Sequence, residues 1–104
     1  MNDIPIACNL GVFTEAERAR HREVSDQWHN AIQEAVNIPT GYAFRFEADP
    51  QMIQLLAEFI SRERLCCPFF HFEIVLEPDG PLWLHLMGDE RVKAFLDHEI
   101  KALL

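Results

Sequence analysis

The sequence predicts an α+β fold, a two-layer sandwich in which one mixed or antiparallel sheet carries helices on one face. Two observations support this prediction. Segments with strand-like alternation are interleaved with segments whose apolar residues recur at helical spacing, and "EPDGP" between two short apolar runs is typical of a hairpin loop. The expected element order is β-α-β-α-β-β-α. The 104 residues fit one domain, residues 1–104.

The N-terminal third is expected to form a strand and then a long helix. The apolar run at residues 4–8 is the first strand, and its proline suits an edge position. Thr14 with Glu17 three residues later forms a capping box, so a helix is predicted from about Glu15 to Val36. Its apolar stripe consists of Val24, Trp28, Ala31, Ile32 and Ala35.

The middle of the chain predicts a strand and a second helix. Residues 42–46 alternate between aromatic and other side chains, which is typical of a half-buried strand. Asp49 is a suitable N-cap, and Pro50 suits the first helical position. Pro68 cannot continue the helix, which should therefore end near Leu65 or Cys66.

The last third predicts a hairpin and a third helix. Residues 71–76 and 82–87 are the two strands, and a helix begins near Asp89. If the last residue of the first strand faces the first residue of the second, then Glu73 faces His85. The same register pairs Val75 with Trp83.

One face of the predicted sheet is left without helices and has a mixed composition. Trp83, Val75 and Met87 would form an exposed apolar patch on it, and such patches usually have a partner. We therefore expect a homodimer through this open sheet face. Its other side chains are Arg45, His71, Glu73 and His85.

Composition and charge exclude several classes of function. The net charge of -8 repels phosphate backbones and anionic lipids, so neither nucleic acid nor a membrane is an expected partner. No apolar run approaches the roughly 20 residues of a membrane span, and the first residues do not resemble a secretory signal. We expect a cytoplasmic protein whose three cysteines are thiols.

The stretch "SRERLCCPFFHFE" holds the main candidate site. Cys66 and Cys67 could be small core residues that extend the apolar stripe of the second helix. Alternatively, they bind a soft ion, since such ions select thiolate ligands and displace the thiol protons. Adjacent cysteines suit linear or trigonal coordination better than a tetrahedral zinc site. Cys8 would complete a three-thiol site if it approached the pair.

Four neighbouring residues could assist the thiols. Arg62 and Arg64 would favour the thiolates, whereas burial and the helix C-terminus would disfavour them. His71 is a candidate fourth ligand, and Glu63 is a further candidate. Phe69 and Phe70 would shield the site.

Two other chemistries remain open at this point. A disulfide between Cys66 and Cys67 would close a strained eight-membered ring that is readily reduced, which suits a redox-active protein. On the open sheet face, Glu73 beside His85 could be an acid–base site or an ordinary cross-strand pair, and we favour the pair. His21, His29 and His98 are expected to be solvated. No glycine-rich phosphate loop, nucleophile elbow or HExxH motif is present.

Four segments together resemble an uncharacterised family of small bacterial proteins. They are "PIACNL", "GYAFRF", "AEFISRERLCCPFFHFEI" and "LWLHLMGDERVKAFL", and the family's ERxCCPF motif corresponds to residues 63–69. Members are often encoded near heavy-metal resistance genes, and the family's N-terminal cysteine corresponds to Cys8. The resemblance implies a role with a soft ion such as Hg(II), Cu(I) or As(III).

The sequence thus supports three hypotheses. The first is a small cytoplasmic thiol protein that sequesters or delivers a soft metal or metalloid ion (Hg(II), Cu(I), Zn(II) or As(III)) through Cys66 and Cys67, with Cys8, and without catalysis. The second is a non-catalytic dimerisation module with inert buried cysteines. The third is a redox-active vicinal dithiol protein.

Overall fold

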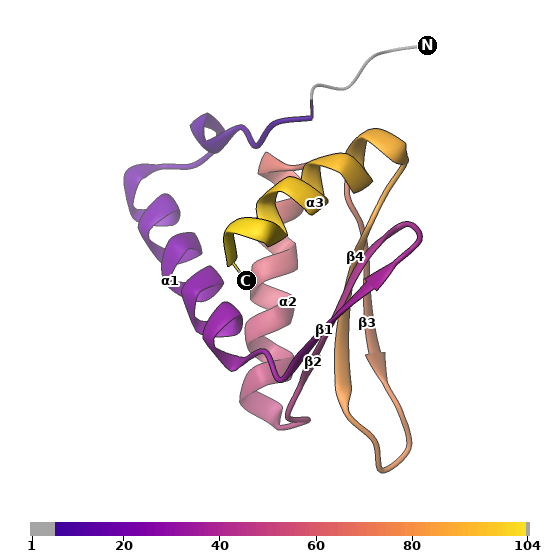
Figure 1. Ribbon diagram of the computed structural model, residues 1–104. Helices are drawn as coiled ribbons and strands as arrows, with labels where there is room; N and C mark the ends of the chain where they lie inside the picture. Colours follow the sequence, from indigo (N-terminus) through magenta and orange to yellow (C-terminus); the bar gives the residue numbers. More distant parts are fainter. Residues whose placement is uncertain (1–5, 104) are drawn as a thin grey trace.

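The computed structural model describes residues 6–103, with side chains through Ile100. It has three α-helices, a short 3₁₀ helix and four strands, which confirms the predicted α+β class (Figure 1). In chain order the elements are η1 (Leu10–Val12), α1 (Glu15–Ala31), β1 (Glu34–Ile38), β2 (Gly41–Phe46), α2 (Pro50–Cys66), β3 (His71–Leu76), β4 (Leu82–Met87) and α3 (Glu90–Leu103).

The strands form one sheet in the order β1-β2-β4-β3, and all neighbours are antiparallel. The helices pack on one face of this sheet (Figure 1), where the ring of Trp28 in α1 contacts Phe44 and Phe46 of β2. The predicted register of the last hairpin is confirmed: Leu76 pairs with Leu82 and Glu73 with His85.

The first predicted strand is not found among the described residues. Ile4 lies outside them, and residues 6–8 form bends and irregular backbone. The segment lies against the end of α2 instead of in the sheet, because the Asn9 amide donates to the Cys66 carbonyl at 2.7 Å. A strand placement of Cys8 was therefore wrong.

The first helix is shorter than predicted, and a strand that the sequence did not predict lies where the end of the helix was expected. The α1 helix ends at Ala31, and residues 34–38 form β1. The Gln33 amide donates to the Arg45 carbonyl at 2.8 Å, which places the chain in register beside β2. Residues 39–40 then join β1 to β2 as a two-residue hairpin loop. Strand β1 pairs with residues 41–45 of β2. If the helix had continued through residues 34–38, the backbone N–H and C=O groups on that edge of β2 would have had no partner in the sheet.

The helix boundaries near the candidate site follow local sequence signals. Thr14 and Glu17 form the predicted capping box at the start of α1. The carboxylate of Asp49 caps α2 at the Met52 amide, and Pro50 occupies its first turn. The end of α2 at Cys66 was also predicted correctly.

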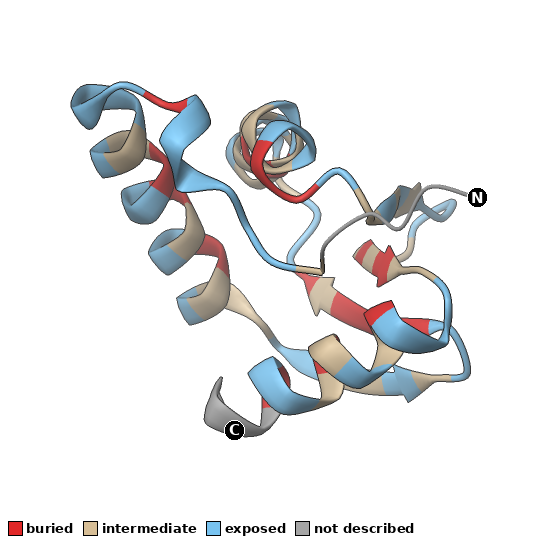
Figure 2. Ribbon diagram, turned by 90° about the horizontal axis from the view of Figure 1, so that it is seen from above, coloured by how far each residue is buried: buried red, intermediate tan, exposed pale blue. Residues whose placement is uncertain are grey.

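The core lies between the sheet and the helices, where the buried segments face one another (Figure 2). Phe59 of α2 is 2% exposed and contacts the ring of Trp28 of α1 at 5.0 Å between centroids. The sheet contributes alternate side chains of β2 and β4: Phe44, Phe46, Leu82, Leu84 and Leu86. Ile74 and Leu76 point to the same face but are 36% and 54% exposed, since they lie on the edge strand β3.

An ion-pair cluster centred on Glu58, about two turns before Cys66, joins α1 to α2. Arg20 donates two hydrogen bonds of 2.7 Å to the two carboxylate oxygens of Glu58, and Arg62 donates a third of 2.6 Å. These bonds, those of Arg20 first, lower the pKa of Glu58 from 4.5 to about 2. Two-pronged pairing of this kind fixes the relative position of the two helices.

We expect Glu58→Gln to lower the free energy of unfolding near neutral pH by about 1 kcal/mol, a value discounted for solvent screening. The folded pKa of Glu58 lies below the unfolded one, so its contribution is complete above about pH 4.5 and disappears as the pH falls toward 2. Urea unfolding of wild type and variant at several pH values measures this. Glu23→Gln is the control, because Glu23 is 59% exposed and makes one contact with Arg20. Equal losses in both variants would contradict the prediction.

A candidate thiol site

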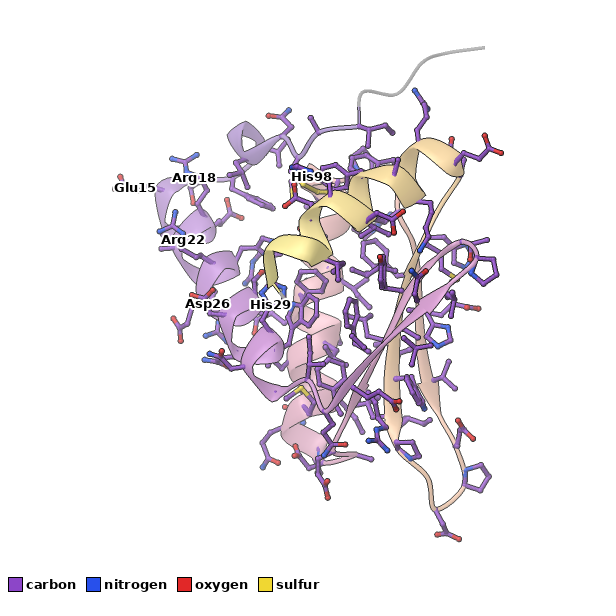
Figure 3. All side chains as sticks on the ribbon, viewed as in Figure 1. Glu15, Arg18, Arg22, Asp26, His29 and His98 are labelled. Carbon is purple, nitrogen blue, oxygen red and sulfur yellow. A yellow bond between two sulfur atoms is a disulfide. The ribbon has the colours of Figure 1, made fainter. Side chains whose placement is uncertain are left out.

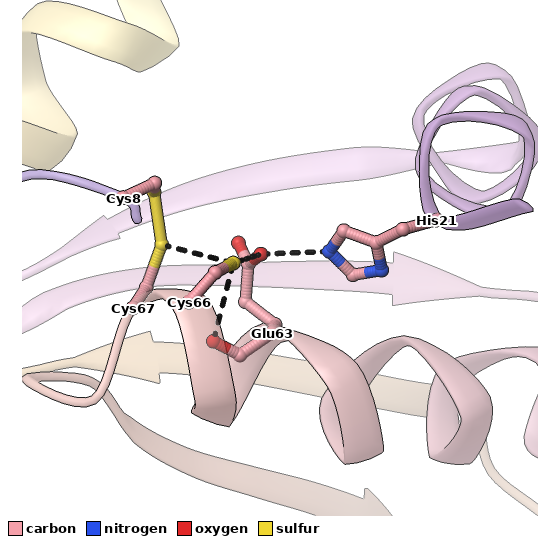
Figure 4. The surroundings of a disulfide bond; sticks show 5 residues. All are labelled: Cys8, His21, Glu63, Cys66 and Cys67. Atoms are coloured by element: carbon pink, nitrogen blue, oxygen red, sulfur yellow. Dashed lines mark hydrogen bonds and ion pairs between the residues drawn. A yellow bond between two sulfur atoms is a disulfide. The ribbon is translucent and has the colours of Figure 1, made fainter. Parts of the chain in front are cut away.

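The three cysteines converge at the C-terminal end of α2. Cys8 and Cys67 form a disulfide, and Cys66 is a buried free thiol with its sulfur 3.7 Å from that of Cys67 (Figure 4). All three sulfur atoms lie within 4.8 Å of one another. The sequence left open whether Cys8 approaches the pair, and the structure places it there. The prediction of three free thiols is therefore wrong for this state, and the disulfide that the sequence allowed between Cys66 and Cys67 does not form.

Local structure explains this convergence. Cys66 is the last residue of α2, and Cys67 caps the helix by donating its amide to the Glu63 carbonyl at 2.7 Å. Pro68 then prevents another helical turn. The bond from the Asn9 amide to the Cys66 carbonyl holds the N-terminal segment at this helix end. The Cα atoms of Cys8 and Cys67 are consequently 4.7 Å apart.

The site is buried on one side and open on the other. Cys66 and Cys67 are 1% and 0% exposed, and they form a small apolar cluster with Phe13. Phe69 and Phe70 pack against this cluster, as the sequence predicted. Cys8, by contrast, is exposed. A ligand can therefore reach the sulfur cluster from the Cys8 side.

A polar chain leads from the free thiol into the protein (Figure 4). The Cys66 thiol donates to Glu63 Oε1 at 3.2 Å, and the same oxygen lies 2.9 Å from His21 Nε2. His21 is 5% exposed, between the rings of Phe13 and Phe59. Its Nδ1 has no hydrogen-bond partner among the described residues. Because a carboxylate oxygen accepts, Nε2 is the donor of this hydrogen bond.

Cys66 is a neutral thiol at physiological pH. Burial first, then the negative charge of Glu63 and the hydrogen bond to it, raise the pKa of Cys66 to about 12. The two arginines that were expected to favour a thiolate do not do so. Arg62 pairs with Glu58, and Arg64 is exposed, so the nearest charge to the thiol is the carboxylate.

We expect Cys66 to resist alkylation in the native, oxidised protein. Both its burial and its raised pKa oppose formation of a reactive thiolate. Iodoacetamide treatment near pH 8, followed by mass spectrometry, should show at least about a hundredfold slower labelling than in urea. Native labelling at the rate of an exposed thiol would contradict this geometry.

The other predicted site residues lie away from the sulfur cluster. His71 is exposed, with Nε2 3.9 Å from a Glu73 oxygen, and it is absent from the metal-ligand groups found in the described part of the chain. His85 Nδ1 lies 3.5 Å from Glu73, which is the cross-strand pair that the register predicted. Arg45 lies 3.6 Å from Glu34 of β1. Trp83 is half-buried on the same open sheet face.

A pocket of about 230 Å³ opens beside the disulfide. Cys8 and Glu63 are among its lining residues, and its walls come from all three helices and the sheet. The walls are mainly aromatic and aliphatic: Trp28, Phe59, Phe70, Leu86, Phe95, Leu96 and Ile100. Ser25, His29 and Glu99 add polar groups. Burial lowers the pKa of His29, which favours its neutral form.

Two of the histidines that sequence reasoning placed in solvent belong to this region. Arg22 and Asp26 lie along the outer side of α1, whereas His29 lies nearer α3 (Figure 3). His21 is buried, and its spacing could have revealed this, since it precedes Val24 by three residues and Trp28 by seven. The pattern extends the apolar stripe of α1 by one turn.

Comparison with family models, curated proteins and solved structures found no match. The resemblance to the ERxCCPF proteins therefore stays a prediction. No helix in the described part of the chain is both long and apolar enough to cross a membrane.

Proposed function

We propose that this protein, in its reduced state, binds one soft metal or metalloid ion through Cys8, Cys66 and Cys67. One observation carries the proposal: three sulfur atoms from two distant parts of the chain lie within 4.8 Å of one another. Soft thiolate sets of this kind select ions such as Cu(I), Hg(II), Zn(II) or As(III).

The surroundings of the cluster support binding without catalysis. Phe13, Phe69 and Phe70 exclude water from one side of it. The net charge of -8 favours a cation over an anion. In the cytoplasm, where we expect this protein, the disulfide would be held reduced and all three sulfurs would be free to bind. Sequestration or delivery of the ion is the role that such a site fits.

The test is titration of the reduced protein with Zn(II), Cu(I), Hg(II) and arsenite, followed by ultraviolet sulfur-to-metal absorption. We expect one ion per chain, with release of thiol protons and therefore tighter binding at higher pH. Single serine substitutions of the three cysteines should each weaken binding. The oxidised wild-type protein is the matched control, since its disulfide blocks two of the three sulfurs. A reduced protein that binds none of these ions would refute the proposal.

A thiol–disulfide redox protein is the second candidate, and the Cys8–Cys67 bond favours it. In that case the disulfide itself would be the working group, exchanging with an external dithiol from the exposed Cys8 side. Equilibration in glutathione redox buffers separates the candidates. A midpoint within the cytoplasmic range of glutathione, together with no ion binding, would select the redox function.

We also propose that the open sheet face joins two copies of this chain. Val36, Ala43, Val75 and Trp83 line a hollow of about 220 Å³ on this face, and the apolar surface there is a suitable interface. In analytical ultracentrifugation, we expect the wild type to sediment as a dimer and Trp83→Glu to sediment as a monomer. Leu65→Glu is the control, because Leu65 is 55% exposed on α2. A monomeric wild type at high concentration would refute this interface.

A further inference from the structure

The pocket beside Cys8 gives the sulfur cluster a second recognition element. Cys8 is at once a member of the three-sulfur group and part of the pocket lining. Most of the other lining residues are apolar side chains of α1, α2 and α3, among them Trp28, Phe59 and Phe95. An inorganic ion bound to the sulfurs would leave this apolar space unused.

The size and lining of the pocket suit a small hydrocarbon group. An apolar protein cavity of about 150 Å³ is enough to bind benzene, and this pocket has about 230 Å³. Trp28 is 2% exposed, and its indole Nε1 has no hydrogen-bond partner among the described residues. Its ring and that of Phe59 lie 5.0 Å apart between centroids, so an aromatic guest would meet aromatic walls.

We infer that the preferred ligand is a soft ion that carries one apolar organic group, such as a monosubstituted organoarsenical of trivalent arsenic. Two cysteine sulfurs bind the ion, and the organic group occupies the pocket. This inference rests on the proposed function, since it names the kind of ion that the thiol site takes. The two sulfurs are those of Cys8 and Cys67. They form the disulfide in the oxidised protein, so one ligand can reach both after reduction, and Cys8 also lines the pocket.

The binding step is balanced and needs no change of oxidation state. Phenylarsine oxide and two thiols form two As–S bonds, and the arsenic-bound oxygen leaves as water with the two thiol protons. Arsenite instead forms three As–S bonds and releases three molecules of water, so it also requires Cys66. Both reactions start from the reduced protein, which a phosphine reductant supplies from the disulfide form.

The two probes therefore predict different effects of the same variant. Cys66→Ser should weaken arsenite binding at least about tenfold and leave phenylarsine oxide binding within about threefold of wild type, because only arsenite loses a sulfur ligand. Cys8→Ser should weaken both. The matched pair of probes thus distinguishes a ligand held by two sulfurs from one held by three.

Varying the size of the organic group on the arsenic tests the pocket itself. We expect the wild type to bind phenylarsine oxide at least about tenfold more tightly than the methyl analogue, through burial of the ring. Ser25→Phe, which fills the pocket from α1, should abolish this preference. Gln27→Phe is the matched control, because Gln27 is exposed on the same helix and does not line the pocket.

Tryptophan fluorescence tests occupation of the pocket without changing any residue that lines it. In a Trp83→Phe background, Trp28 is the single remaining tryptophan. Its fluorescence should change on binding of phenylarsine oxide and stay nearly constant with arsenite, since only the phenyl group enters the pocket.

The outcomes separate this inference from the proposed function. Arsenite binding with no preference for phenyl over methyl, and no change in Trp28 fluorescence, would overturn the pocket inference and leave the thiol site standing. A reduced protein that binds Zn(II), Cu(I) or Hg(II) but neither arsenite nor phenylarsine oxide would also overturn the inference and leave the thiol site standing. Binding of none of these probes would overturn both. A phenyl preference that disappears in Ser25→Phe and persists in Gln27→Phe would establish the pocket as the organic subsite.

Discussion

Replacing Cys8 by serine in the oxidised protein is expected to lower the free energy of unfolding by about 2–4 kcal/mol. The Cys8–Cys67 disulfide joins residues 59 positions apart in the sequence, so its loop contains α1, β1, β2 and α2. A cross-link of this span removes many conformations from the unfolded chain. Urea unfolding of the oxidised proteins, followed by circular dichroism, measures the difference.

Two controls identify the disulfide as the cause. Cys66→Ser keeps the disulfide and should retain most of the stability, because the serine hydroxyl can still donate to Glu63. Wild type treated with a phosphine reductant should unfold at nearly the same urea concentration as Cys8→Ser. Identical unfolding of oxidised and reduced wild type would show that the cross-link contributes nothing.

This prediction bears on function, because the form that binds an ion is the less stable, reduced one. A ligand that binds only the folded state raises the free energy of unfolding in proportion to the logarithm of its concentration. An ion held by the three sulfurs would thus restore the connection between the N-terminal segment and α2 that reduction removes.

Gly41→Ala is expected to lower the free energy of unfolding by more than about 3 kcal/mol. A Cβ atom at this position would lie 1.9 Å from the backbone carbonyl oxygen of Leu86. Leu86 belongs to β4, a central strand paired on both sides, so its backbone cannot move away without breaking the sheet. Thermal or urea unfolding of the purified variant measures the loss, and failure to fold would be its extreme form.

Gly11→Ala is the matched control for this substitution. Its Cβ would lie 3.1 Å from the side-chain oxygen of Asn9 in the exposed 3₁₀ helix η1, so we expect a change within about 0.5 kcal/mol. Equal stability of Gly41→Ala and Gly11→Ala would mean that β2 and β4 are not packed as closely as the structure shows.

Much of the fold could be read from local signals. Asp49, Pro50 and Pro68 bounded α2 correctly because capping and proline sterics act within a few residues. The register of the β3–β4 hairpin followed from its loop and its alternation. Residues 34–36 were assigned to the end of the first helix instead of to β1, because their strand conformation depends on pairing with β2 and not on their own pattern.

The cysteines of the candidate site could be predicted from the sequence, but the bonds and contacts that they make could not. The sequence singled out Cys66 and Cys67 through their unusual adjacency and left the approach of Cys8 open. It suggested arginines as the charged neighbours, whereas the structure pairs Arg62 with Glu58 and places Glu63 against the thiol. Which charge faces a given thiol depends on side-chain directions at the helix end, and spacing does not fix these.

Local sequence signals were enough to predict the α+β class, the end of α2 at the two adjacent cysteines and the aromatic side chains that cover them. These features depend on local sterics and on hydrophobic periodicity, which a single chain segment carries. Three features could be seen only in the folded protein: Cys8 bonds to Cys67, Glu63 links the Cys66 thiol to His21, and an apolar pocket opens beside Cys8. Each of these requires segments far apart in the sequence to pack together, and that packing is fixed only when the whole core forms.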